Sequence, residues 1–318
     1  MLTVGEVHTG LLQNSTSLTQ LRSAQLLALL PGARVHRSER PIPHAVSPDV
    51  LRGVDCRLAT SSGARVRGIG TMVSRAAITG GRVLQGLAYA HITKSEADRR
   101  LPWSHYLSRP GVVETPGKAD RADLASGFLS TKPAPEILDL GALSGRMMDM
   151  VQQRSSELDR RPPFRMARIR MRCVVVVHEG QPADARIHFT IDSDTTRTLR
   201  LTVGENDLPA AVELCADLAL HDWLLTALLE LIERSRSGRG ARPQVVERLR
   251  PAIDGLLHLW MPAVRLDEVM LPLWRSVEQK SGFTKQWDAS VGWIRDQVTL
   301  NTITLLSALV EDEGDEDG

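Results

Sequence analysis

The sequence is poor in several kinds of residue, and each shortage argues against a class of protein. Aromatic residues make up 4 % of the 318 residues, and the three cysteines, Cys56, Cys173 and Cys215, lie far apart. No C-x-x-C pair or Cys/His ligand spacing is present, which argues against structural zinc and for a reducing compartment. No apolar run reaches the roughly 18 residues of a membrane helix, and the first residues lack the pattern of a secretory signal. We therefore expect a cytoplasmic protein with no metal site and no membrane partner.

Familiar catalytic motifs are missing as well. The sequence contains no G-x-S-x-G elbow, no G-x-x-x-x-G-K-[ST] phosphate loop and no H-E-x-x-H zinc motif. It therefore indicates no catalytic residue, no metal and no cofactor. Whether the protein is an enzyme stays open at this point, and the missing motifs favour a non-enzymatic role.

The charges are distributed unevenly along the chain. The net charge is +1, but the last eight residues, EDEGDEDG, carry six carboxylates, so elsewhere 39 basic residues face 32 acidic ones. Such a run of like charges is typical of a disordered tail, which we place at 310–318. The overall balance is far from the strongly basic one that nucleic-acid-binding domains show.

The N-terminal region, residues 1–95, is predicted to be rich in β-structure. Its clearest element is a hairpin centred on Gly80 and Gly81, because glycine accepts the positive φ angles of a two-residue turn without steric cost. A turn centred there pairs Ile78 with Val83. The strands on both sides of it are apolar on both faces, as expected of a sheet that is covered on both sides.

Two segments are rich in turn residues and are predicted to be irregular connections. They span residues 41–64 and 99–135. Helix is predicted to return at about 137–156 and to end before the two prolines of LDRRPPF, because proline cannot continue a helix.

Three segments in the middle of the chain show period-two alternation of apolar and polar side chains. They span residues 167–177, 185–191 and 198–203. This alternation predicts strands with one apolar and one polar face. If the strands form an antiparallel meander, five arginines share the polar face: Arg168, Arg170, Arg172, Arg186 and Arg200.

The C-terminal third is predicted to be helical and contains five of the six tryptophans. Tryptophan brings a large apolar area, so this density indicates a well-packed bundle. We predict helices at about 208–234, 243–260, 266–279 and 285–309. The expected fold is α+β, with a β-rich N-terminal region, a central antiparallel sheet and a C-terminal α-helical domain. The expected divisions are 1–205, 206–309 and the tail at 310–318.

His221 lies on the apolar stripe of the helix predicted at 208–234. Asp217, four residues earlier, can reach its ring across one turn of that helix. A buried neutral imidazole needs hydrogen-bond partners for both nitrogens, and a carboxylate can serve as one of them. The sequence supplies no nucleophile or second base beside it, so we interpret His221 as a core residue.

The arginine face is the first candidate binding site. Five arginines within roughly 15 Å create a potential that attracts an anionic partner. That partner could be nucleic acid, an acidic protein surface or the acidic tail of the chain itself, or the face could simply be solvated. The face carries no aromatic side chain on which bases could stack, so nucleic acid is not the favoured partner.

An alternative site could be built by the loops at 44–57 and 102–114. These segments hold polar and aromatic residues of the kind that act in binding and catalysis on loops. The candidates are His44, Asp55, Arg57, His105 and Arg109. Convergence of these side chains in one cleft would favour an enzyme of unrecognised type.

Several strings of the sequence together resemble a known family. They are SPDVLRGVDCRLATSSGARVRGIGT, RLPWSHYLSRPGVVE, LDRRPPF, LALHDWLLT and LLHLWMPAVRLD. With these strings the chain resembles an uncharacterised family of actinobacterial proteins of similar length, encoded beside a variant P-loop protein and a predicted methyltransferase. The resemblance spans roughly Gly5 to Ser307 and leaves out the acidic tail. It carries no catalytic roles, but it implies membership of a multi-gene system.

These observations together favour an interaction or scaffold component of a larger cytoplasmic assembly. We expect protein partners, among them the products of neighbouring genes. An enzyme with a loop-built site is the alternative, and a nucleic-acid-binding protein is the further alternative.

Overall fold

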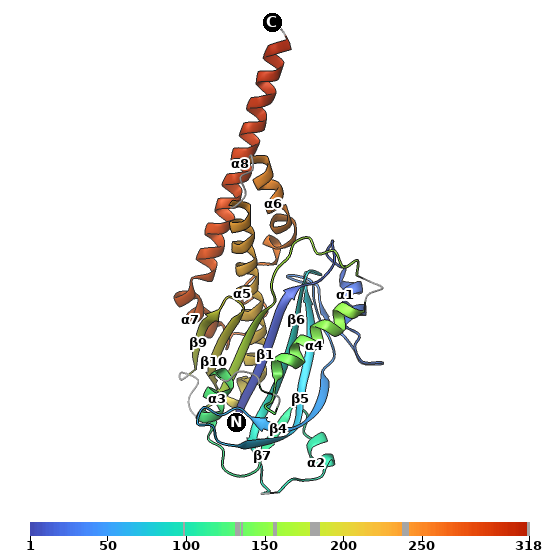
Figure 1. Ribbon diagram of the computed structural model, residues 1–318, viewed down its shortest axis with the longest axis vertical. Coiled ribbons are helices and arrows are strands. Elements are labelled where there is room, and N and C mark those ends of the chain that lie inside the picture. The colour runs from blue at the N-terminus through green and yellow to red at the C-terminus, as the bar shows by residue number, and fades with distance from the viewer. Residues whose placement is uncertain are drawn as a thin grey trace. The chain divides into compact units, whose positions relative to one another are not determined.

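The computed structural model describes residues 1–97, 99–130, 134, 136–154, 158–178, 185–236 and 242–316 (Figure 1). The fold is α+β, as predicted, with a ten-stranded mixed sheet and with helices concentrated in the C-terminal part. Two compact units divide the chain. The first unit holds residues 1–220 and 262–277, and the second unit holds residues 221–261 and 278–318. The expected boundary at 205/206 thus differs from the observed division, which falls inside one long helix.

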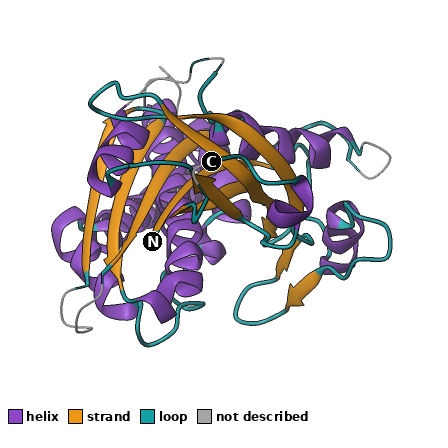
Figure 2. Cartoon of the chain, turned by 90° about the horizontal axis from the view of Figure 1, so that it is seen from below, coloured by secondary structure: helices purple, strands orange, loops and turns teal. Residues whose placement is uncertain are grey.

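The sheet belongs entirely to the first unit and forms one strongly twisted layer (Figure 2). The strand order is β2-β3-β5-β7-β6-β1-β8-β10-β9, with β4 paired to β5 and with β5 also paired to β6. The strands are β1 (Leu2–Leu11), β2 (His36–Ser38), β3 (His44–Val46), β4 (Val50–Leu58), β5 (Val66–Thr79), β6 (Val83–Lys94), β7 (Val112–Thr115), β8 (Ile169–Val177), β9 (Arg186–Ser193) and β10 (Thr196–Val203).

Helices α3 (Arg121–Ser130) and α4 (Leu140–Gln153) pack on one face of the sheet. Asp139 caps α4, because its side chain accepts a hydrogen bond of 2.9 Å from the backbone N–H of Ala142. Gly86 of β6 lets α4 approach closely, since a Cβ at that position would lie 2.1 Å from the backbone oxygen of Ser144. The core under these helices includes Leu2, Val4, Val174, Leu124 and Leu140.

The opposite face of the sheet meets the start of α5 (Leu208–Arg236). Within the first unit, Gln85 of β6 donates a hydrogen bond of 2.9 Å to the backbone oxygen of Ala216 in α5. Arg75 of β5 forms an ion pair with Glu213 of the same helix. These contacts hold residues 208–220 of α5 against β5 and β6.

The second unit is built around the later part of α5, α6 (Arg242–Gly255) and α8 (Phe283–Glu316), with α6 packed on α8. The ring of Trp260 stacks on Trp287 at 4.3 Å between centroids, and His221 meets Trp260 edge-on at 5.1 Å. His221 is 1 % exposed, which agrees with the predicted core position. The remaining helices are α1 (Gln20–Leu27), α2 (Trp103–Leu107) and α7 (Leu271–Ser281), with 3-10 turns at Glu205–Asp207 and Leu257–Leu259.

The hairpin forms where it was predicted, but its register differs by one residue. Ile78 pairs with Leu84 instead of Val83, because the loop holds three residues, Gly80, Gly81 and Arg82. Both glycines have positive φ, and the N–H of Arg82 donates to the carbonyl of Thr79 to close the turn. The carbonyl of Arg82 instead accepts from Leu12 beside β1, which keeps Arg82 out of the β5–β6 ladder.

The segments predicted to be irregular contain regular structure. Residues 41–64 hold β3 and the nine-residue β4, and residues 99–135 hold α2, β7 and α3. β4 pairs along its length with β5 and forms one further bridge, between Arg57 and Ile137. Most of its side chains are exposed or half-buried, so it needs no apolar alternation. β7 has four residues, too few for a period to show in the sequence.

The strands β8, β9 and β10 do not form the expected meander. β9 and β10 are antiparallel, as their short connecting turn requires, but β8 pairs with β10 in parallel and β9 lies at the edge. The expected disordered tail also differs, because α8 continues through Glu316.

Candidate functional site

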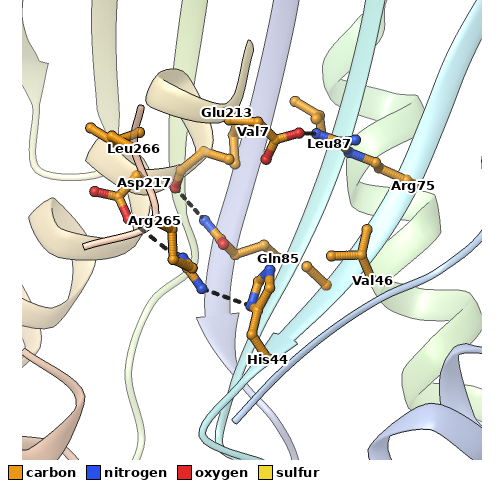
Figure 3. A pocket seen from close by; sticks show the side chains of 12 residues that line it. Val7, His44, Val46, Arg75, Gln85, Leu87, Glu213, Asp217, Arg265 and Leu266 are labelled. Carbon is orange, nitrogen blue, oxygen red and sulfur yellow. Dashed lines mark hydrogen bonds and ion pairs between the residues drawn. The ribbon is translucent and has the colours of Figure 1, made fainter. Parts of the chain in front are cut away.

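A cavity of about 170 Å³ lies on the sheet face that α5 covers, entirely within the first unit (Figure 3). Its lining comes from β1, β3, β5, β6, the start of α5 and the segment before α7. Six aliphatic side chains contribute: Val7, Val46, Ala77, Leu87, Ala216 and Leu266. Six polar side chains complete it: His44, Arg75, Gln85, Glu213, Asp217 and Arg265.

The pairing of the strands explains why the sheet residues face the cavity together. Arg75 lies opposite Leu87, which lies opposite Val7 on the next strand. Two residues further along β5, Ala77 lies between Val46 and Gln85. Paired residues and residues two apart point to the same face of a sheet. The floor of the cavity is therefore a small apolar patch with polar groups at its two ends.

Arg265 joins three parts of the first unit around the cavity. Its guanidinium donates to Nδ1 of His44 on β3 at 2.8 Å and to Oδ1 of Asp217 on α5 at 3.2 Å. The other oxygen of Asp217, Oδ2, accepts from the backbone N–H of Ala263 at 3.2 Å. Ala263 has a positive φ of 61°, a conformation that costs an L-residue roughly 1–2 kcal/mol. The Asp217 carboxylate thus holds the turn that places Arg265.

The contact with Arg265 assigns the proton of the His44 ring. A guanidinium can only donate, so Nδ1 of His44 must be the acceptor and Nε2 carries the hydrogen. Thr79 Oγ1 lies 3.0 Å from the same Nδ1. Burial and the neighbouring charge of Arg265 lower the pKa of His44 from 6.5 to about 3. At neutral pH His44 is therefore a neutral hydrogen-bond donor and a poor base.

The charges of the cavity are balanced but differ in exposure. Asp217 is buried, with 3 % of its side chain exposed, and Arg265 is its partner. Glu213, the partner of Arg75, has 54 % of its side chain exposed at the mouth. None of the described lining residues carries a hydroxyl, a thiol or an amine. The cavity therefore has the features of a binding site, with apolar side chains beside a few polar groups.

The five residues of the predicted arginine face have different surroundings. Arg170 and Arg172 of β8 lie 3.4 and 3.5 Å from the carboxylate of Glu6 on β1, and Glu6 is 1 % exposed. Burial raises the pKa of Glu6 to about 7, against the opposing effect of the two arginines. Arg168 pairs with Asp149 of α4 at 2.8 Å.

The other two arginines of that face, Arg186 and Arg200, are exposed. Arg172 is buried, contacts the Phe128 ring and donates to the backbone oxygen of Phe128 at 3.2 Å. Helices α3 and α4 thus cover the inner part of this face. Glu6 lies directly opposite Arg172 across the β1–β8 pair and was not expected there from the sequence.

The residues of the alternative loop site are held by three different sets of partners. His44 lies at the cavity, opposite Thr79, whereas Asp55 lies opposite Ile69, ten residues away along β5 and so roughly 33 Å distant. Asp55 accepts two hydrogen bonds from Arg67, and Arg57 pairs with Glu136 at 2.7 Å. His44 therefore does not share a cleft with Asp55 and Arg57, which together line a different pocket.

His105 and Arg109 form the third group, because both contact the buried carboxylate of Glu114 on β7. Burial acts to raise the pKa of Glu114, but hydrogen bonds from His105 and Ser95, together with the charges of His105 and Arg109, lower it overall. The predicted loop site is thus divided, and only His44 reaches the cavity. One sequence signal could have indicated the cavity: Asp217, an acid within an apolar helix, which the sequence connected with the His221 ring instead.

Neither a metal centre nor a membrane span emerges from the described part of the chain. No group of three or more His, Cys, Asp or Glu side chains among the described residues could hold a metal ion. Over the same residues, no helix combines the length and the apolar character that crossing a membrane requires. No protein-family model matches the sequence, and no curated protein or solved structure is significantly similar to it.

Proposed function

We propose that the protein is a non-enzymatic interaction component of a larger assembly and that the outer segment of α8, residues 298–307, is its contact surface. The observation that carries this proposal is a group of large apolar side chains exposed on one helix. Leu300 is 42 % exposed, Ile303 54 %, Leu305 50 % and Leu306 58 %. Such a concentration on one element is typical of a surface that a partner covers.

The apolar residues surround the helix instead of forming one stripe. At 100° per residue, Ile303, Leu305 and Leu306 are rotated by roughly 300°, 140° and 240° from Leu300. A helix that is apolar all round is normally buried. Figure 1 shows α8 continuing beyond α6, its neighbour in the second unit. The outer segment therefore has the character of a core helix that is missing its neighbours.

The threonines of the outer segment strengthen its apolar character. Thr299, Thr302 and Thr304 each donate a hydrogen bond of 2.9–3.0 Å to the backbone carbonyl four residues earlier. Their hydroxyls are satisfied within the helix, which leaves their methyl groups available for packing. Burial of this segment against other helices would therefore leave few polar groups without a hydrogen bond.

Charge favours a second copy of the chain, running antiparallel, as the occupant of this surface. The acidic run of residues 311–318 begins four residues after the outer segment ends, so a parallel pair would bring twelve carboxylates together. Residues 234–250, at the end of α5 and in α6, carry six arginines against one glutamate. An antiparallel pair can place the acidic run of one copy beside this basic stretch of the other.

Light scattering of the full chain at several concentrations tests the proposal. We expect a dimer that dissociates on dilution and a monomer for the Ile303→Asp/Leu306→Asp variant. Leu107→Asp is the matched control, since Leu107 is 60 % exposed on α2 and should leave the dimer intact. A wild-type chain that stays monomeric at every concentration would contradict self-association. Stoichiometric capture of a purified product of a neighbouring gene, lost in the same double variant, would replace the second copy with that partner.

The orientation of the pair is tested by mixing Thr299→Cys and Ser307→Cys variants under mild oxidation. An antiparallel pair centred on residue 303 should give the mixed 299–307 disulfide. A parallel pair would give only 299–299 and 307–307 disulfides and would overturn the charge argument. High salt should weaken the antiparallel dimer, because it screens the attraction between the acidic run and the arginines.

A further inference from the structure

We infer that the cavity at His44 and Arg265 binds a small carboxylate with a short aliphatic or single-ring body. This inference does not depend on the surface of α8, because the cavity lies wholly within the first unit. It rests on four properties of the cavity: the excess of hydrogen-bond donors, the charge balance, the apolar floor and the volume.

Donors in the cavity outnumber acceptors. Arg265 has five N–H groups, and the described residues take up two of them, one at His44 and one at Asp217. The Nε2–H of His44 has no partner among the described residues, since both contacts of its ring are made at Nδ1. Both oxygens of Asp217 already accept bonds. An entering group must therefore supply acceptors, and a carboxylate supplies two oxygens.

The charge balance also accommodates one anion. Arg75 and Arg265 line the cavity with Glu213 and Asp217, and His44 is neutral by the tautomer argument above. Asp217 is buried, but Glu213 is more than half exposed and can turn toward solvent. With Glu213 turned out, Arg75 loses its counter-charge while Asp217 still balances Arg265, so the cavity has a net charge of +1, which one entering carboxylate neutralises. A dianion or a cation would leave a partly buried charge without a counter-charge.

The floor and the volume set the size of the ligand body. Val46 and Leu87 line the cavity beside its polar groups (Figure 3). Ala77, which lies between Val46 and Gln85 in the sheet, completes this apolar surface. The volume is about 170 Å³, and an apolar cavity of about 150 Å³ is large enough to hold benzene. A single ring or a branched chain of a few carbons therefore fits, whereas a nucleotide does not.

In this arrangement the carboxylate accepts from the Nε2–H of His44 and from the remaining N–H groups of Arg265. The hydrophobic body packs on the floor between β3, β5 and β6. Arg265 acts here as a positioned donor, because Asp217 and His44 already fix its guanidinium. His44 binds the ligand as a neutral donor and takes no proton from it.

Benzoate and benzamide are the probes that test the chemistry, since they share one shape and differ in charge. Ligand-observed NMR on the full chain should show benzoate binding with a Kd on the order of 1 mM, as expected for so small a molecule. Benzamide should bind about tenfold more weakly, because it cannot form charge-assisted hydrogen bonds with Arg265. Equal binding of the two probes would overturn the assignment of a carboxylate, and absence of benzoate binding would overturn the site.

Two variants locate the binding in this cavity. Ala77→Leu fills the floor without removing a charged group and should abolish benzoate binding, with circular dichroism reporting whether the chain is folded. His44→Phe removes the Nε2–H and should weaken binding about tenfold. The control is Arg57→Gln, an exposed arginine paired with Glu136 outside the cavity, which should bind benzoate like the wild type. Unchanged binding by a folded Ala77→Leu variant would place the ligand elsewhere and refute the inference.

Discussion

Arg265 donates a hydrogen bond of 2.8 Å to Nδ1 of His44, although 221 positions separate the two residues in the sequence. The contact ties the segment before α7 to the short strand β3, and the bond from Arg265 to Asp217 ties the same segment to α5. One side chain thus links three distant parts of the first unit. This relationship leads to the first of four predictions.

Replacement of Arg265 by methionine should destabilise the chain by about 3–5 kcal/mol. Methionine keeps most of the packing volume but leaves the buried Asp217 carboxylate without its charged partner. Urea unfolding measures the loss. The control, Arg57→Met, removes an exposed ion pair and should cost less than about 1 kcal/mol. Similar losses in the two variants would show that Asp217 does not depend on Arg265.

Glu6 should make the stability of the chain depend on pH between about 4.5 and 7. Burial raises the pKa of Glu6 from 4.5 to about 7, so the folded chain holds this proton at pH values where the unfolded chain has lost it. The free energy of unfolding therefore falls as pH rises through that window, by about 3 kcal/mol from this group. Glu6→Gln removes the titrating group and should flatten the profile by that amount. Parallel profiles of the two chains in chemical unfolding would contradict the assignment.

Two glycine-to-alanine substitutions should change stability in opposite directions. At Gly81, φ is 61° and a Cβ would lie 2.0 Å from the backbone oxygen of Leu18, so Gly81→Ala should cost more than about 2 kcal/mol. At Gly145, within α4, a Cβ meets nothing within 4 Å. Gly145→Ala should therefore stabilise the chain by about 0.5–1 kcal/mol through helix propensity. The same sign for both changes in thermal unfolding would refute this account.

Trp287 should be essential to the second unit. Its ring is stacked on Trp260 and is 4 % exposed, so truncation to alanine opens a large cavity. We expect Trp287→Ala to cost about 3–5 kcal/mol in chemical unfolding and to change the near-ultraviolet circular dichroism. Trp103 is 38 % exposed on α2, so Trp103→Ala should cost clearly less. Equal effects would mean that the Trp260–Trp287 stack contributes little to stability.

Much of the fold could be predicted, because the spacing of apolar residues along the sequence indicates the local secondary structure. The alternation in residues 169–177 and the apolar stripe around His221 are visible without any knowledge of partners, and both elements form where expected. β4 was not predicted, because its exposed side chains at the sheet edge need not alternate between apolar and polar residues. The parallel pairing of β8 with β10 was also not predicted. The pattern of a strand shows which of its faces is apolar, but it does not show which strand pairs with it.

Only part of the candidate site could be predicted from the sequence. His44 was named among the loop residues, and Asp217 was noted as an acid in an apolar helix. Their link through Arg265 was invisible, because it depends on a segment that follows α6 in the chain and yet belongs to the first unit. Glu6 was missed for a similar reason, since its two arginine neighbours lie more than 160 positions away.

The amino-acid sequence by itself determined which side chains avoid water, because the period of the apolar residues follows from backbone geometry alone. It thereby specified the α+β character, the helices of the C-terminal third and the buried position of His221. Only the tertiary structure decided which polar groups meet. The contacts that bring them together, the register of β3 on β5 and the packing of residues 262–277 in the first unit, join residues far apart in the sequence. These long-range contacts bring His44, Asp217 and Arg265 together around one cavity.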